Sequence, residues 1–152
     1  MPIPIGQEYM EAPAALGKIA NYQSVEANTT ACGAEEIVFG KAVYAEEDVA
    51  QVMTTGKDFF GVVLARSYVK EITAGDKAGV YVKGDAVPVI RKGTIWVQVD
   101  EDVISNQKAV VNTATGNFLP ANTALESKTE VVGTFMSTAM ADGLAMLQIN
   151  LP

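Results

Sequence analysis

Side chains that could carry out acid-base, nucleophilic or metal chemistry are few in this sequence. The 152 residues contain no histidine, the side chain that most often serves as general acid or base near neutral pH and as a zinc ligand. The single cysteine, Cys32, stands between Ala31 and Gly33. A thiol in such surroundings is more often a buried filler than a nucleophile, and the sequence leaves both interpretations open. The serines lack a histidine to activate them. We therefore predict that the protein is not an enzyme.

The acidic residues gather in three short clusters that could in principle form a site. These are Glu35-Glu36, Glu46-Glu47-Asp48 and Asp100-Glu101-Asp102. Adjacent carboxylates on a strand point to opposite faces, so neighbours do not form a catalytic pair. The third cluster follows a predicted strand and is the best calcium candidate, but its spacing matches no known calcium loop. No Gly-Lys pair has the spaced glycine of a phosphate-binding loop. We expect solvated turns, with no metal and no cofactor.

The charge balance constrains the partners. The chain has 18 acidic and 11 basic residues and a formal net charge of -7, which disfavours nucleic acid as a partner. No apolar run approaches the roughly 18 residues of a membrane span, and the first twenty residues do not read as a signal peptide. We expect a protein partner, no membrane and synthesis in the cytoplasm.

From residue 37 onward, short runs of β-branched and aromatic residues alternate with glycine-containing turns, a pattern typical of strands. The predicted strands are residues 37–44, 60–66, 69–73, 79–82, 86–91, 94–99, 108–112, 130–137 and 144–151. The predicted turns are residues 55–58, 74–77, 83–85, 91–93 and 115–117. Residues 16–33 could hold a poor edge strand followed by a loop at 28–30, and residues 46–53 could form one or two helical turns. The sequence thus predicts an all-β fold, a small single-domain barrel or sandwich of short antiparallel strands over residues 16–152.

Alternation within the runs predicts the buried side chains. In residues 94–99, Ile95, Val97 and Val99 share one face, whereas Trp96 lies on the other with Thr94 and Gln98. Trp96 could cover a loop at the rim or anchor a subunit interface, where tryptophan is enriched. The predicted core consists of Phe39, Val43, Val62, Leu64, Val87, Val89, Ile95, Val97, Val132 and Leu147.

Residues 1–15 differ from the rest because Pro2, Pro4 and Pro13 interrupt any helix. We interpret them as an extended N-terminal arm that contacts a neighbouring subunit or the larger assembly that the protein binds. Its candidate interface residues, besides Trp96 in the domain, are Ile3, Ile5, Tyr9 and Met10. The alternative is a disordered terminus, since chain ends often fray.

Several segments together resemble the cement, or head decoration, proteins of tailed-phage capsids. The central one is Gly84-Asp85-Ala86-Val87-Pro88-Val89-Ile90-Arg91-Lys92-Gly93-Thr94-Ile95-Trp96-Val97. Residues 37–43 and 60–64 resemble the two earlier strands of that family and residues 115–118 its later turn, whereas residues 103–109 depart from its usual Gly-Asp turn.

This resemblance covers roughly residue 16 to the C-terminus. It implies a structural virion protein on the capsid exterior, often a homotrimer, that is assembled in the host cytoplasm. Its partner would be the major capsid protein, whose neighbouring subunits it would hold together.

Two other functions compete with a cement role. A carbohydrate- or ligand-binding β module, such as a receptor-binding domain, would need exposed aromatics, but Trp96, Tyr44, Tyr68 and Tyr81 fall on different predicted strands. A glycosidase using carboxylates alone would need paired acids, which the sequence does not show.

Overall fold

The computed structural model describes residues 16–20, 24–33, 36–65 and 80–151. Within these residues the chain forms strands and turns and no helix, so the all-β prediction is confirmed. No helix in this part of the chain is long and apolar enough to span a membrane. The interface candidates Ile3, Ile5, Tyr9 and Met10 and the predicted strand at 69–73 lie outside the described residues.

The eleven strands are short, with one exception, β7. They are β1 (Glu26–Cys32), β2 (Glu36–Val38), β3 (Ala42–Glu46), β4 (Val49–Val52), β5 (Gly61–Val63), β6 (Val80–Val82), β7 (Ala86–Gln98), β8 (Lys108–Val111), β9 (Phe118–Pro120), β10 (Gly133–Phe135) and β11 (Leu144–Asn150).

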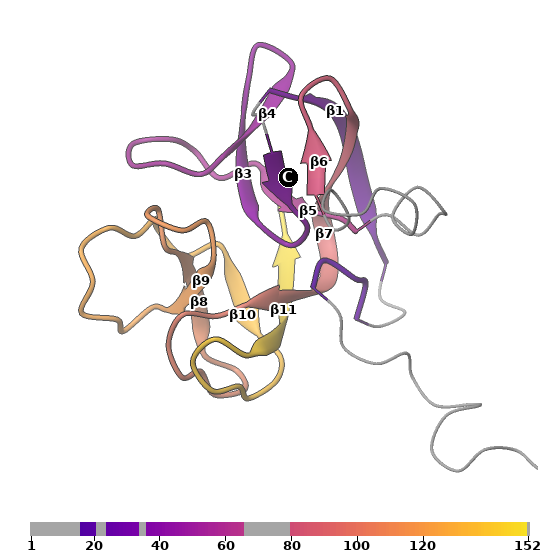
Figure 1. Cartoon of the computed structure of the whole chain (residues 1–152). Helices are drawn as coiled ribbons and strands as arrows, with labels where there is room; N and C mark the ends of the chain where they lie inside the picture. The colour runs from indigo at the N-terminus through magenta and orange to yellow at the C-terminus, as the bar shows by residue number, and fades with distance from the viewer. Residues whose placement is uncertain (1–15, 21–23, 34–35, 66–79, 152) are drawn as a thin grey trace, which may run out of the picture.

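Five strands close into a barrel (Figure 1). The order is β1-β4-β3-β5-β7, and β7 pairs back with β1. All these pairs are antiparallel except β1 with β4, which is parallel and is joined only at Ala31 and Cys32. The small β2–β6 sheet packs on the barrel core through Ile37 and Tyr81.

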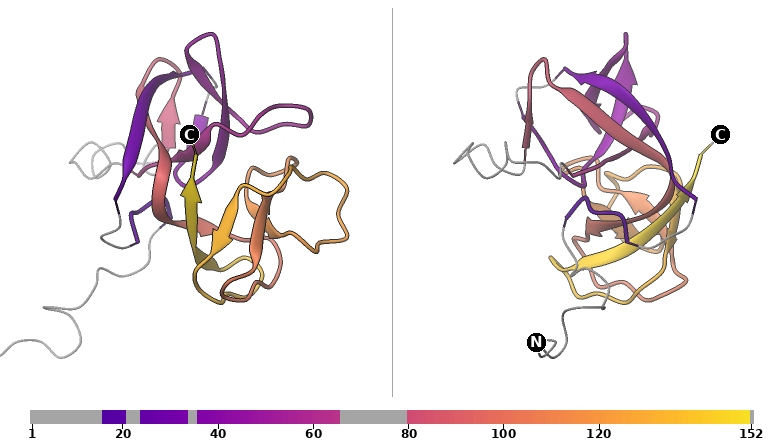
Figure 2. Two further views of the ribbon diagram at one scale, coloured as in Figure 1. Left: turned by 180° about the vertical axis from the view of Figure 1, so that it is seen from behind. Right: turned by 90° about the vertical axis from the view of Figure 1, so that its right-hand side faces the viewer.

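β7 runs out of the barrel and becomes the first strand of a second unit, which we call the lobe. Beyond β7 the sheet continues as β11-β10-β8-β9, and the lobe lies beside the barrel in every view (Figure 2). The predicted turn at residues 91–93 is therefore wrong, because Lys92 and Gly93 pair with Asn150 and Ile149 inside a continuous strand. The strand bends instead of turning. Gly93 has φ +132°, a conformation that a side chain disfavours, and the pairing with β1 shifts register beside it, between Glu26 and Ala27.

The barrel wall between the two units is buried on both faces. In β5 all three residues are buried, with Val63 in the barrel core and Val62 in the core shared with the lobe. In β3, Val43 likewise lies in the barrel core and Ala42 in the core shared with the lobe. The two apolar cores therefore lie on opposite faces of the same strands, and these strands join the barrel to the lobe.

The predicted core is largely confirmed. Leu64 and Val132 are only partly buried at its margin, and the remaining predicted core residues are buried. In β7, Ile95, Val97 and Val99 are fully buried as the alternation predicts. Thr94 is also fully buried, against the prediction that its face is the polar one.

Three local predictions are wrong. The strand at 37–44 is split between β2 and β3, because the chain turns at Gly40 with φ +79°. No helix forms at 46–53, where Glu47 and Asp48 have φ +50° and +68° and make a hairpin turn between β3 and β4. The loop expected at 28–30 lies inside β1, which β7 holds in place.

Other boundaries shift less. The strand predicted at 130–137 shortens to β10. The turns at 55–58, 83–85 and 115–117 are confirmed, each with a glycine at φ between +79° and +90°.

Candidate interaction surfaces

Residues 17–20, which follow the predicted arm, are held on β7 by backbone hydrogen bonds. Gly17 N donates to Trp96 O at 2.9 Å, Trp96 N donates to Lys18 O at 2.9 Å, and Ala20 N donates to Thr94 O at 2.8 Å. Residues 17–20 therefore run antiparallel to β7 along the edge that β11 does not occupy. The segment that follows the predicted arm is thus bonded directly to the strand that joins the two units.

Two glycines allow this close approach. Gly17 has φ +79°, and a Cβ there would lie 2.8 Å from Phe39 Cβ and 2.9 Å from Gly40 N. Gly17 O in turn accepts from Ala65 N at 2.8 Å. The sequence predicted only a poor edge strand somewhere in residues 16–33 and did not indicate that it pairs with β7 at residues 17–20; the signal available was a glycine shortly after the proline-rich segment.

Trp96 lies on β7 beside that attachment, opposite Met146 of β11, and is half-buried. The structure thus places it next to the segment that follows the predicted arm. Its role as an interface anchor stays a prediction.

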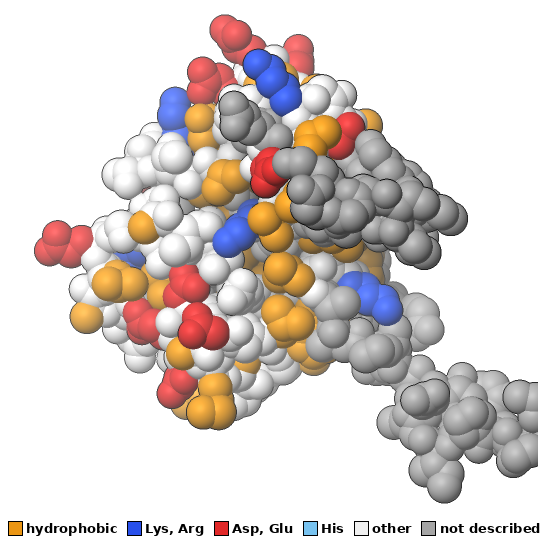
Figure 3. Space-filling view, in the orientation of Figure 1, with side chains coloured by type: hydrophobic (Ala, Val, Ile, Leu, Met, Phe, Trp, Pro, Cys, Tyr) orange, Lys and Arg blue, Asp and Glu red, His pale blue; other side chains and the backbone are white. Residues whose placement is uncertain are grey.

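Figure 3 shows acidic side chains spread over barrel and lobe on one face rather than gathered in one patch, with hydrophobic side chains between them. Among the residues that the structure describes, the most exposed large hydrophobics are Met140, 77% exposed, and Ile104, 64% exposed. Their loops are tied together, because Val103 and Ala139 exchange backbone hydrogen bonds at 2.9 and 3.0 Å. We call these two residues the lobe tip. Sequence reasoning missed it, although Ile104 stands conspicuously before the polar Ser105-Asn106-Gln107.

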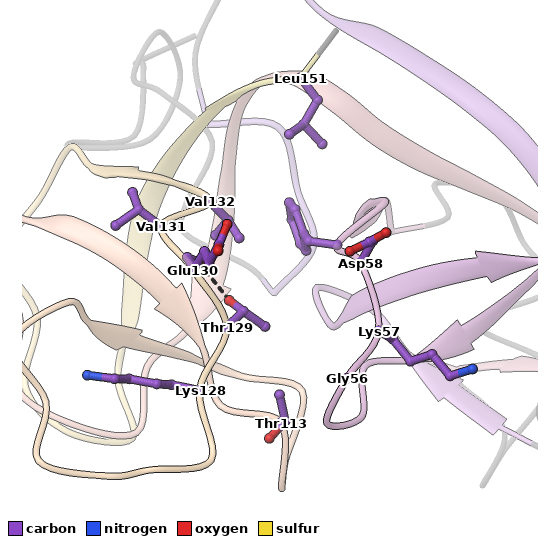
Figure 4. Close-up of a pocket in the computed structure, with 11 residues that line it drawn as sticks. Gly56, Lys57, Asp58, Thr113, Lys128, Thr129, Glu130, Val131, Val132 and Leu151 are labelled. Atoms are coloured by element: carbon purple, nitrogen blue, oxygen red, sulfur yellow. Dashed lines mark hydrogen bonds between the residues drawn. The ribbon is translucent and has the colours of Figure 1, made fainter.

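A groove of about 530 Å³ separates the barrel loop before β5 from the lobe segment before β10 (Figure 4). Asp58 stands on the barrel side and Glu130 and Val131 on the lobe side, while the Lys57 and Lys128 side chains extend away from it. Its aromatic residue, Phe59, packs edge-on against the buried Phe118, with ring centroids 6.4 Å apart.

The aromatic side chains do not assemble a sugar platform in the described residues. Tyr81 is 1% exposed and donates its hydroxyl to Leu64 O at 2.6 Å. Tyr44 on β3 carries the Lys57 ammonium 5.2 Å from its ring centroid, and Trp96 lies on a different strand. Tyr68 lies outside the described residues.

The acidic cluster Asp100-Glu101-Asp102, the best calcium candidate in the sequence, forms hydrogen bonds to neighbouring loops. Asp100 accepts from Asn112, Thr115 and Asn117, Glu101 from Thr123, and Asp102 from Ala141 N at 2.8 Å. The three carboxylates thus stabilise different loops of the lobe rather than converge on one point. Among the described residues no three metal-ligating side chains come together.

The other reactive side chains also have structural places. Cys32 is 2% exposed and belongs to the barrel core, as the filler interpretation expects. In the β3–β4 hairpin, Glu46 faces Lys57 at 3.4 Å with both side chains about half exposed, a kind of pair that adds little stability. In the part of the chain that the structure describes, these side chains therefore make structural contacts within an all-β protein.

The comparisons with known proteins agree with that class. The family model described as structural cement protein (E217 gp24/Pam3 gp6) matches residues 5–150. The chain belongs to this family of phage structural proteins.

Among solved structures, the chain is similar to one in the capsid of Myoviridae phage XM1, with a TM-score of 0.71 and 15% identity over 97% of this chain and 95% of that one. The head fibre gp8.5 N base of bacteriophage phi29 is also found, at a TM-score of 0.48 and 15% identity over 84% of this chain and 95% of that one. No curated protein matches. The protein is a structural component of a phage capsid.

Proposed function

We propose that the protein binds the exterior of the phage head, as a homotrimer, and holds neighbouring major capsid subunits together without catalysing a reaction. The observation that carries the proposal is the match to a cement family over almost the whole chain, residues 5–150. The anchored carboxylates and the buried thiol support a protein that works through surface contact alone.

The physical basis of such a function is linkage. A protein that binds the expanded shell and not its precursor shifts the equilibrium toward the expanded state by the free energy of binding. This requires contact area and a rigid body. The shared barrel–lobe wall supplies the rigidity, and the arm and lobe tip supply apolar side chains for contact.

The test is addition of the purified full chain to undecorated heads of the phage that encodes it, in the expanded and unexpanded forms. We expect saturable binding to expanded heads, visible as added density on the outside of the shell by cryo-electron microscopy, and greater resistance of those heads to heating. Binding that is absent, or confined to the interior, would contradict the proposal.

A further inference from the structure

β1 is unusual because almost all of its side chains are exposed. Residues 24–29 are all exposed, and within β1 only Cys32 is buried. Side-chain burial therefore cannot explain why this segment is extended. Its pairing with β7, from Glu26 to Ala31, holds it.

The hydrogen bonds show which backbone groups of β1 face outward. Cys32 N donates to Asp85 O beside β7, whereas Gly33 N donates to Ala50 O of β4. Successive residues of a strand point their N–H and C=O groups to opposite edges. Asn28 and Thr30 therefore face β7, while Ala27, Thr29 and Ala31 face the other edge.

That other edge is only partly covered in the described structure. β4 pairs with β1 in parallel, starting with Val49 opposite Ala31, and the hairpin turn at Glu47 and Asp48 precedes it. The stretch of β1 before Ala31 therefore extends past the start of β4. Among the described residues, nothing pairs with the outward backbone groups of Ala27 and Thr29.

We propose that this edge of β1 is a strand-addition site that takes the N-terminal arm of a second copy of the chain. The arm sequence fits one-sided pairing. Pro2 and Pro4 lack N–H groups, and in an extended segment both would lie on the same edge, leaving the N–H groups of Ile3 and Ile5 on the opposite edge. A strand of this kind can add to an open sheet edge and cannot template a further strand, which blocks uncontrolled assembly.

The position of residues 17–20 favours a neighbouring copy over the chain's own β1. Lys18 lies opposite Trp96 and Ala20 opposite Thr94. As the residue number falls from 20 to 18, this segment therefore moves along β7 away from residues 86–92, which pair with β1. Fifteen extended residues span up to about 50 Å, enough to reach an adjacent molecule. The inference rests on the proposed homo-oligomer and specifies the contact that would link its members.

The direct test is thiol cross-linking between two populations of the full chain. One carries Ile5→Cys and the other Ala27→Cys, and a short bis-maleimide tolerates a shift of one register step. We expect a mixed cross-linked dimer in concentrated solution or on heads, and none from either population alone. The wild type controls for Cys32, which is 2% exposed.

Two variants then test strand pairing itself. Thr29→Pro removes the backbone N–H of residue 29, which faces the open edge. We expect the yield of the mixed cross-linked dimer to fall by about fivefold, the factor that corresponds to the net contribution of one backbone hydrogen bond. Thr29→Val keeps the donor and should cross-link normally. If Thr29→Pro fails to fold, Ile3→Pro on the arm serves the same purpose, with Pro4→Ala as its control.

The outcomes separate this inference from the function. A third population carries both Ile5→Cys and Ala27→Cys in one chain. Cross-linking within that chain, with no mixed dimer from the first two populations, would place the arm on its own β1 and overturn the proposal. No cross-link in either setting would also overturn it, even where heads bind normally. A mixed cross-link without head binding would keep this inference and refute the capsid function.

Discussion

Lys41 is the residue at which the two units meet most closely by polar contact. Lys41 directly precedes β3 of the barrel. Its Nζ donates to Thr115 O at 3.0 Å and to Asn117 Oδ1 at 2.7 Å, both in the turn between β8 and β9 of the lobe. Asn117 in turn donates to Asp100 Oδ1 at 3.0 Å. Burial lowers the pKa of Lys41 from its usual 10.5, and the charge of Asp100 opposes that shift without cancelling it.

This shift has a consequence for stability. Between the lowered folded pKa and 10.5 the unfolded chain binds the proton more tightly, so stability rises with pH across that window. We expect the free energy of unfolding of the wild type, relative to Lys41→Met, to increase as pH rises from neutral toward 10.5. Urea titrations at several pH values measure it. A difference that is flat or falling with pH would contradict the assignment.

The glycines at residues 17 and 56 offer a matched pair. Both have positive φ, +79° and +85°, but a Cβ at Gly17 meets Phe39 and Gly40 whereas one at Gly56 meets nothing within 4 Å. Gly56→Ala should cost only the backbone strain, about 1 kcal/mol, and Gly17→Ala should cost about 1–3 kcal/mol more. Thermal unfolding of both variants gives the comparison. Equal losses would mean that the segment at Gly17 is not packed as described.

Single side chains were predictable where alternation governs them. Ile95, Val97 and Val99 are all buried. Alternate residues of a strand lie on the same face of the sheet, so the three apolar side chains point together toward the core. Thr94 was not predictable, because its burial depends on a neighbour far along the chain: Ala20 N bonds to Thr94 O. The lobe tip was not predicted for the same reason. The pairing of Val103 with Ala139, far apart in the sequence, is what ties the loops of Ile104 and Met140 together.

At the scale of elements, strand identity was easier to predict than strand continuity. The segments around β5, β6, β8 and β11 were located because each is a short apolar run beside turn residues. Glycine was ambiguous: at Gly40 it makes a turn inside a predicted strand, and at Gly93 it makes a bend inside a predicted turn. β1 was missed because its residues are small and polar, and its extended form depends on β7.

Deletion of residues 1–15 tests the arm as an element. Gly17–Ala20 remain anchored on β7 by their own hydrogen bonds, so we expect an unchanged melting temperature at protein concentrations low enough for the chain to be monomeric. Each large apolar side chain buried on a partner contributes about 1.5–3 kcal/mol before ordering costs. Occupancy on heads, measured by quantitative gel analysis, should therefore fall. Unchanged occupancy would show that the arm is not a tether.

The lobe tip gives an independent prediction. Ile104→Lys and Met140→Lys replace exposed side chains, so each should change stability by less than about 0.5 kcal/mol. If the tip touches the shell, burial of either lysine would weaken head binding at least about tenfold. Leu125→Lys, at a side chain 43% exposed on a different loop, is the control. Full binding by both tip variants would remove this surface from the interface.

For the whole molecule, we expect a trimer by sedimentation equilibrium, or monomers that assemble into trimers on the head. Because binding acts by mass action, the melting temperature of decorated heads should rise with free protein concentration. At 100 times the dissociation constant, binding stabilises the head by about 2.7 kcal/mol per site. Head melting that is independent of concentration would contradict stabilisation by binding. Monomers both in solution and on heads would contradict the trimer.

The continuous β7 also has a mechanical meaning. Its ladder with β11 runs over seven consecutive pairs, from Leu144 with Gln98 to Asn150 with Lys92. Tension applied along β7 loads all these hydrogen bonds in shear at the same time, whereas tension across the strands opens them one after another. Gly17 and Lys18 are bonded to this same strand through the backbone of Trp96. If the proposed arm contact holds a neighbouring molecule, strain that enters through it would be carried along the strand that crosses both units, in the direction in which a β ladder resists separation best.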